Sequence, residues 1–213
     1  MKNKKTYYHL ILDRSGSMSS CWRPTTQAFS AQMVKINQLA KDFPEQEFMV
    51  SLCVFNEALS FPEWPVKVGA GQLPSIENIQ PNGSTALFDA IGESIQRLQS
   101  IAGSQIVNDE ASVVVVVLTD GEENASIRFT GGKLKSMMDE LKSSEKWNFV
   151  FIGADFDVAA LSNSLNVSAS NRRNFSKGDM GVVFDSVEKN LRTYAESKRS
   201  GKLGKNFFED ENN

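Results

Sequence analysis

Apolar and polar residues along this chain form patterns that predict strands and helices in alternation. Two largely apolar runs, 7–12 and 113–118, predict strands, and the second, which is unbroken, is typical of a strand covered on both faces of a parallel sheet. Apolar residues at helical spacing predict the helices between the strands. The expected strands are 7–13, 48–55, 113–119 and 148–154, with a weak strand at 167–170, and the expected helices are 24–43, 87–101, 134–141, 157–164 and 180–194.

The segments between the second expected strand and the following helix add an edge strand and loops to this architecture. Residues 57–65 are predicted to be a return arm at the edge of the sheet, because Pro62 and Pro65 suit an edge strand better than a central one. Residues 66–84 are rich in Gly and Pro and are expected to form loops. The alternation of strands and helices predicts an α/β fold with a mostly parallel sheet.

Length and charge narrow the class of protein. The chain has 213 residues, a formal net charge of -3 and few cysteines, so we expect one domain over 1–197, a polar, flexible tail over 198–213, and no nonspecific binding to nucleic acid or anionic lipid. No apolar run is long enough to span or insert into a membrane. Because no signal-peptide cleavage site follows the basic start, we expect a cytoplasmic protein in which Cys21 and Cys53 are reduced.

Oxygen-bearing side chains follow the two apolar runs. Asp13 ends the first and opens the pattern Asp13-x-Ser15-x-Ser17, and Asp120 follows the second. If these strands are neighbours where the strand order reverses, both acids face one crevice. Thr85 comes from a third loop, just before a helix. Five oxygens from three loops suit an octahedral ion completed by water, so we predict Mg2+, with Mn2+ as a fit to the same ligands. Zinc is disfavoured, because the chain has one His and two scattered Cys.

Each residue also has a simpler explanation. An aspartate alone is typical of a strand end, and a single Ser or Thr is typical of a helix cap; the five together favour the metal site. For Asp89 we favour support of the N-terminus of its helix over a position behind the metal ligands. For residues 122–124 we favour a solvated acidic turn over the rim of the site. We expect His9 to pack in the core. Four residues beside the first loop are equally compatible with partner contact and with covering the core: Arg14, Met18, Trp22 and Arg23.

The five positions together resemble the metal-ion-dependent adhesion site (MIDAS) of von Willebrand factor type A (vWA) domains, over residues 5–197. The resemblance implies a Rossmann-like, doubly wound sheet of about six strands, with helices on both faces and residues 57–65 as one antiparallel edge strand. It also implies that Ser15, Ser17 and Thr85 coordinate the metal, that Asp13 and Asp120 bind it directly or through water, and that a partner's Asp or Glu completes the site. Bacterial single-domain members act inside cells, some beside AAA+ ATPases or in stress-resistance and conflict operons.

Three functions are therefore in competition. The first is a metal-dependent module, not an enzyme, that binds an acidic group of a partner protein, such as an AAA+ ATPase or another protein encoded in the same operon. The second is a metal-dependent hydrolase or phosphotransferase, which the lack of a phosphate-binding loop and of a credible Ser-His-Asp set disfavours. The third is an intracellular adaptor whose metal is only structural.

Overall fold

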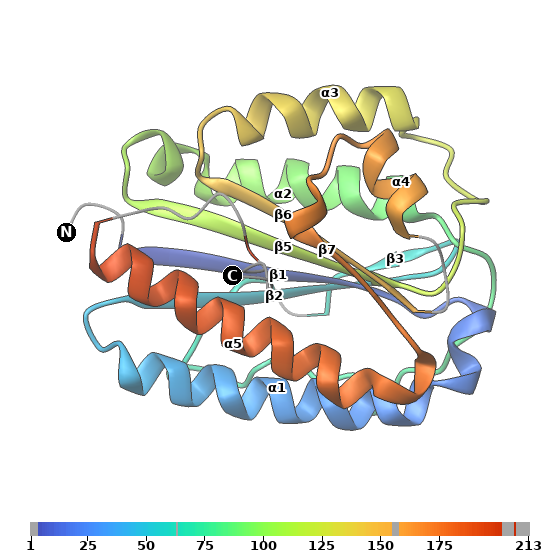
Figure 1. Cartoon of the computed structure of the whole chain (residues 1–213), viewed down its shortest axis with the longest axis horizontal. Coiled ribbons are helices and arrows are strands. Elements are labelled where there is room, and N and C mark those ends of the chain that lie inside the picture. The colour runs from blue at the N-terminus through green and yellow to red at the C-terminus, as the bar shows by residue number, and fades with distance from the viewer. Residues whose placement is uncertain (1–3, 63, 155–157, 202–206, 208–213) are drawn as a thin grey trace.

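A mixed sheet lies between two layers of helices (Figure 1). The computed structural model describes residues 4–62, 64–154, 158–201 and 207. The strands are β1 (Lys5–Asp13), β2 (Glu47–Phe55), β3 (Leu59–Ser60), β4 (Val66–Lys67), β5 (Ala111–Thr119), β6 (Trp147–Ala154) and β7 (Arg172–Phe175). The helices are α1 (Trp22–Asp42), α2 (Leu87–Val107), α3 (Gly131–Lys142), α4 (Val158–Ser164) and α5 (Met180–Arg199), and the 3-10 turns are η1 (Gly16–Ser20), η2 (Ala169–Asn171) and η3 (Lys177–Asp179).

The strand order is β3-β2-β1-β5-β6-β7, and β4 also pairs with β2. All pairings among β2, β1, β5, β6 and β7 are parallel, whereas β3 and β4 run antiparallel to β2. The chain thus winds from β1 outward to β2 on one side and then returns to β5 on the other. The predicted α/β fold, with a mostly parallel sheet and an antiparallel edge, is confirmed.

Two predicted boundaries were wrong. The expected weak strand at 167–170 is instead β7 at Arg172–Phe175, preceded by η2. The sequence of β7 is mostly polar because the strand lies at the sheet edge, so the hydrophobic pattern does not reveal it. The expected loop at 66–84 contains β4 at its start, because the return arm meets β2 twice.

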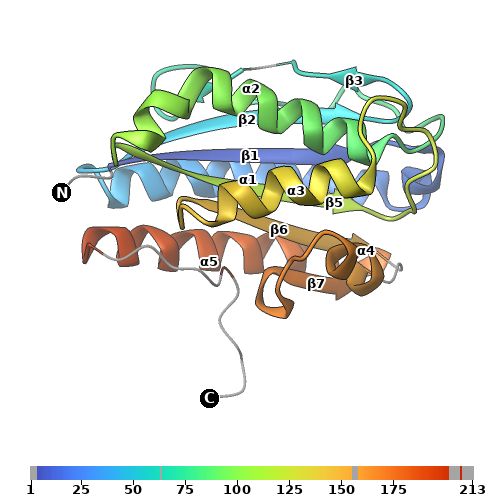
Figure 2. The same cartoon turned by 90° about the horizontal axis from the view of Figure 1, so that it is seen from above.

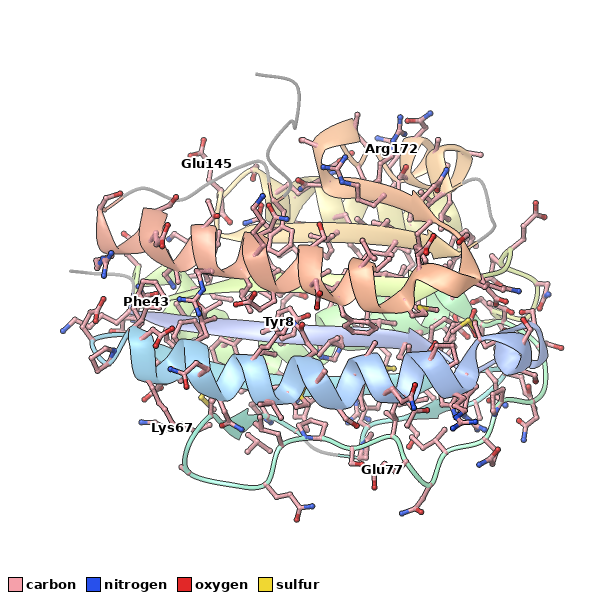
Figure 3. All side chains as sticks on the ribbon, turned by 60° about the horizontal axis from the view of Figure 1, so that its bottom comes forward. Tyr8, Phe43, Lys67, Glu77, Glu145 and Arg172 are labelled. Atoms are coloured by element: carbon pink, nitrogen blue, oxygen red, sulfur yellow. The ribbon has the colours of Figure 1, made fainter. Side chains whose placement is uncertain are left out.

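The alternation of side chains along β1 divides the core into two clusters. Tyr8, Leu10 and Leu12 pack on the face covered by α1 and α5, and Figure 3 shows Tyr8 on this face. Tyr7 and Ile11 pack on the opposite face, under α2 and α3, which lie in front of the sheet in Figure 2. Because β5 is buried along its whole length, it supplies valines to both clusters. This two-sided burial explains its unbroken apolar sequence.

His9 lies in the core, as predicted. Its ring is fully buried, Nδ1 lies 2.8 Å from Ser51 Oγ, and the ring meets Trp64 edge to face with centroids 4.9 Å apart. Burial lowers the pKa of His9 to about 3. Cys21 and Cys53 are both buried and form no disulfide with each other, so both cysteines contribute to packing.

The C-terminal region is only partly described. Helix α5 continues to Arg199, with Lys198 buried, and the Phe207 N–H donates to Asn171 Oδ1 at 2.7 Å. Residues 202–206 and 208–213 of the expected tail lie outside the described residues, so the division at 197 and 198 stays a prediction. Among the described residues, no helix is both long and apolar enough to cross a membrane.

Candidate metal centre

The candidate site lies where β1 and β5 end side by side. These strands are parallel neighbours, with Leu12 opposite Leu118. The strand order reverses between them, because β2 flanks β1 on the other side. The loops that leave β1 and β5 therefore open at the same edge of the sheet (Figure 1). This topology brings Asp13 and Asp120 to the same edge of the sheet, as the sequence predicted.

Asp13 organises the first loop. Its side chain is buried, Oδ1 accepts the Ser15 N–H at 2.7 Å, and Oδ2 accepts the Thr119 hydroxyl at 2.6 Å. Burial raises the pKa of Asp13; the hydrogen bonds from Thr119 and Ser15 oppose this, whereas the nearby charge of Asp120 adds to it. Each oxygen of the ionised carboxylate keeps a further lone pair. Asp13 therefore shapes the loop while retaining the capacity to bind water or a cation.

The two serines join this loop to the end of β5. Ser15 Oγ lies 3.0 Å from Ser17 Oγ, and the Ser17 hydroxyl donates to Asp120 Oδ1 at 2.6 Å. Thr85 faces the same space: a Cβ placed on Gly121 would lie 3.6 Å from Ser17 Oγ and 3.7 Å from Thr85 Oγ1. Three hydroxyls and one carboxylate, drawn from three loops, thus lie close together beside Gly121.

Backbone contacts hold Thr85 in this position. The Gly16 N–H donates to Gly83 O at 3.0 Å, which ties the first loop to the loop that carries Thr85. The Thr85 N–H donates to Asn124 Oδ1 at 2.8 Å, and the Asn124 N–H donates back to Thr85 O at 3.0 Å. Gly83 has a φ of +76°, which favours glycine. Asn124, in the loop that follows β5, therefore holds Thr85 in position.

The acidic residues beside the site serve the same scaffold. Glu123 Oε2 accepts the Phe88 N–H at 2.7 Å, in the first turn of α2. Asp89 accepts hydrogen bonds from three successive backbone N–H groups at 127–129. The predicted solvated turn at 122–124 is confirmed for Glu122 and Asn124, which are exposed, and was wrong for Glu123, which is half-buried and bonded to α2. The predicted role of Asp89 at its own helix was too narrow, because its carboxylate fixes the loop before α3.

The residues that flank the first loop also hold the scaffold. Arg14 donates to Asn56 Oδ1 at 3.2 Å and to Asn82 Oδ1 at 3.3 Å. The Trp22 indole N–H donates to Ile79 O at 2.8 Å, and the ring is buried. Arg14 and Trp22 thus connect the first loop with the segments that precede Thr85.

The electrostatics of the cluster suit a hard cation. Asp120 has a fully buried side chain, and its Oδ2 accepts no directional hydrogen bond from any described residue. The cation that faces this oxygen is the Lys177 ammonium, 2.6 Å away. A buried carboxylate oxygen that faces a cation and lies next to neutral hydroxyls also suits Mg2+ or Mn2+. Within the described part of the chain, no group of three or more His, Cys, Asp and Glu side chains gathers to hold a metal, so the fit rests on two carboxylates and three hydroxyls.

Sequence reasoning missed two contributors to the site, Thr119 and Lys177, and considered Asn124 only as part of the rim. Thr119 belongs to the apolar run that predicts β5, so its hydroxyl attracts no notice until its bond to Asp13 is seen. Lys177 lies in η3, far along the chain, within a polar stretch. Nothing in the local sequence of Lys177 indicates that it reaches Asp120.

Comparisons with known proteins give the family. The model of the von Willebrand factor type A domain matches residues 9–190, so the chain belongs to this family. Domains of the family commonly act as metal-dependent protein-interaction modules that bind a divalent ion at the MIDAS. No curated protein matches the chain.

Solved structures share the fold at low sequence identity. The ArnB paralog VWA2 from Sulfolobus acidocaldarius is 14% identical with a TM-score of 0.55, over 87% of this chain and 45% of that one. Proximal thread matrix protein 1 from the mussel byssus, with a zinc-occupied MIDAS motif, is 18% identical with a TM-score of 0.58, over 90% and 47%. The vWF domain of a type V pili tip protein from Porphyromonas gingivalis is 11% identical with a TM-score of 0.66, over 91% and 97%. The chain thus spans less than half the length of the first two of these proteins.

Proposed function

We propose that this protein is a metal-dependent binding module, not an enzyme, that recognises an acidic group of a partner protein through Mg2+ at the sheet edge. Ser15, Ser17 and Thr85 would hold the ion through their hydroxyls, and Asp13 and Asp120 would bind it directly or through water. The bound ion would supply an electron-poor coordination position for an outside carboxylate. Mn2+ fits the same oxygens.

One observation carries this proposal. The Ser17 hydroxyl bonds to Asp120 across two loops, and Thr85 Oγ1 faces the same gap beside Gly121. Capping helices or ending strands does not require hydroxyls from separate loops to gather beside a buried carboxylate such as that of Asp120. The neutral hydroxyls contribute no charge, so an ion held by them keeps a net positive charge and favours an anionic partner group.

The positions of potential catalytic groups support a binding role. His9, the one histidine of the chain, packs against Trp64 in the middle of the fold. It therefore offers no general base at the candidate site, which disfavours a hydrolase or phosphotransferase. Generic phosphate and ester substrates test that alternative: turnover that is lost in Ser15→Ala would support an enzyme and contradict this proposal.

Metal binding is the first test. Isothermal titration of the metal-free protein with Mg2+ and with Mn2+ should show one site, and Asp13→Ala and Thr85→Val should abolish or strongly weaken it. Ser75→Ala is a matched control in an exposed loop, and it should bind as the wild type does. Unchanged affinity in the two site variants would refute the ligand assignment. Zn2+ belongs in the same series, because the related mussel protein has a zinc-occupied MIDAS.

Partner recognition is the second test, and it separates the proposed module from an adaptor with a structural metal. Capture of a partner from a lysate of the native host should be lost with EDTA and in Thr85→Val, while thermal unfolding changes little. A large loss of thermal stability with EDTA, together with unaffected capture, would favour the adaptor.

The cellular setting is part of the proposal. We place the protein in the cytoplasm, with a partner that offers Asp or Glu, such as an AAA+ ATPase or another protein encoded in the same operon. The two buried cysteines form no disulfide with each other, which supports a reducing compartment. Structural relatives include a type V pili tip protein, so fractionation of the native host is the direct check, and recovery outside the cell would contradict this placement.

A further inference from the structure

A lysine from the far end of the fold reaches the candidate metal site. Lys177 belongs to η3, the turn between β7 and α5. Its Nζ lies 2.6 Å from Asp120 Oδ2 and donates to the Ser17 backbone carbonyl at 3.3 Å. The lysine side chain is 26% exposed, whereas that of Asp120 is fully buried. The ammonium therefore approaches the site from its solvent side and meets two of the three loops.

Lys177 contacts Oδ2 of Asp120, the oxygen that is available to a directly bound metal ion. Asp120 Oδ1 already accepts the Ser17 hydroxyl, and Oδ2 has no directional hydrogen bond from a described residue. An ammonium 2.6 Å from Oδ2 neutralises the charge of the buried carboxylate. That arrangement is a charge contact that a stronger cation can replace.

An ion on this oxygen and the ammonium cannot both stay in place. A divalent ion coordinated by Asp120 would lie within a few Å of the present position of Nζ, and like charges at that separation repel strongly where water is partly excluded. Salt screens this repulsion little, because the Debye length exceeds the distance. Occupation of the site therefore requires Lys177 to withdraw.

We propose that Lys177 is a tethered cation that competes with the divalent ion for Asp120, so that metal binding releases η3 and the start of α5 from the metal face. This inference rests on the proposed metal site. It adds an internal competitor that lowers the affinity for the ion, and it links occupation of the site to the last helix.

Affinity measurements test the competition. In titrations with Mn2+ and Mg2+, Lys177→Met should bind about tenfold more tightly than the wild type, a change that corresponds to about 1.4 kcal/mol. Lys189→Met removes the same charge from an exposed position on α5 and should stay within about twofold of the wild type. Lys177→Arg keeps the charge and should also stay near wild-type affinity. Circular dichroism and unfolding of each variant would establish that it is folded before titration.

A second readout follows the release itself. Hydrogen exchange of the segment 172–183 should become faster when the wild type is saturated with Mg2+. In Lys177→Met it should be fast without metal and unchanged by it. Exchange that the metal leaves unchanged in the wild type would overturn the proposed release.

The outcomes separate the two proposals. If the wild type binds the ion and Lys177→Met binds it equally or more weakly, the competition is refuted and the metal site stands. If the wild type and Lys177→Met both fail to bind Mg2+ and Mn2+, the metal site is refuted and the competition with it. Tighter binding in Lys177→Met, absent from Lys189→Met, supports both.

Discussion

The buried lysine at the end of α5 makes stability depend on pH in a predictable direction. Lys198 Nζ donates to Lys5 O at 2.9 Å, to Thr6 Oγ1 at 2.8 Å and to Ser112 Oγ at 3.0 Å. All three acceptors are neutral, and no carboxylate of a described residue pairs with the ammonium. Burial lowers the pKa of Lys198 from 10.5 to about 7. Lys198 is only 2% exposed, so solvent screens this effect little.

The direction in which the free energy of unfolding changes with pH follows from proton binding to Lys198. Between pH 7 and pH 10.5 the unfolded chain holds a proton on Lys198 that the folded chain has lost, so the free energy of unfolding rises with pH. The limiting slope is about 1.4 kcal/mol per pH unit, and integration from pH 7 to pH 8.5 gives a gain of about 1.5 kcal/mol. Above that range, buried Cys53 opposes the gain, because burial raises the pKa of its thiol to about 12 and the unfolded thiol ionises first.

Urea unfolding at pH 7 and pH 8.5, in the wild type and in Lys198→Met, measures this effect. The wild type should gain about 1.5 kcal/mol and the variant almost nothing, because Met carries no titrating group. The pH slope is compared rather than absolute stability, since Met also removes three hydrogen bonds. A wild type without the gain, or a variant with the same slope, would refute the assignment of a depressed pKa to this lysine.

Three further predictions concern the core and the loop beside the metal face. Because the pKa of His9 is lowered to about 3, the wild type should lose about 1.5 kcal/mol of unfolding free energy between pH 6.5 and pH 5, and urea unfolding of His9→Gln should show a smaller loss. A Cβ on Gly92 would lie 2.5 Å from the Phe129 ring, so Gly92→Ala should lower the free energy of unfolding by about 1–3 kcal/mol and weaken metal binding. Gly103 lies in the same helix with open space around it. Gly103→Ala, the control, should therefore be neutral or stabilise the fold by up to about 1 kcal/mol. In Asp89→Ala, three backbone N–H groups lose their acceptor. The variant should therefore lose at least about 2 kcal/mol of unfolding free energy and bind the metal more weakly, although no ligand is removed. Unchanged metal affinity in a folded variant would show that this loop does not support the site.

Much of the fold was readable from the sequence because burial imposes clear periodicities. The valines of β5 are apolar without interruption because both faces of that strand are covered. Helix α1 begins at Trp22, two residues before its predicted start at Pro24, which occupies the first turn where a missing N–H costs little. The edge strand β7 could not be placed, because exposure at an edge removes the apolar pattern on which such predictions depend.

The candidate site, like the fold, was only partly predictable from the sequence. Asp13 and Asp120 were predictable because each ends a strand recognisable by its apolar run, and parallel neighbours end at one edge. Asn124 and Lys177 act through contacts with residues distant in the chain, so local sequence carried no signal for them. Tertiary structure alone showed that an acidic turn positions Thr85 and that a lysine before the last helix meets Asp120.

The most direct test of the metal site is a crystal structure of the protein with Mn2+, located by its anomalous scattering. The proposal predicts one strong peak among the hydroxyls of Ser15, Ser17 and Thr85 and the carboxylate of Asp120, with Lys177 displaced from that carboxylate. A strong peak elsewhere, or an empty site at a concentration of Mn2+ that saturates binding in solution, would contradict it.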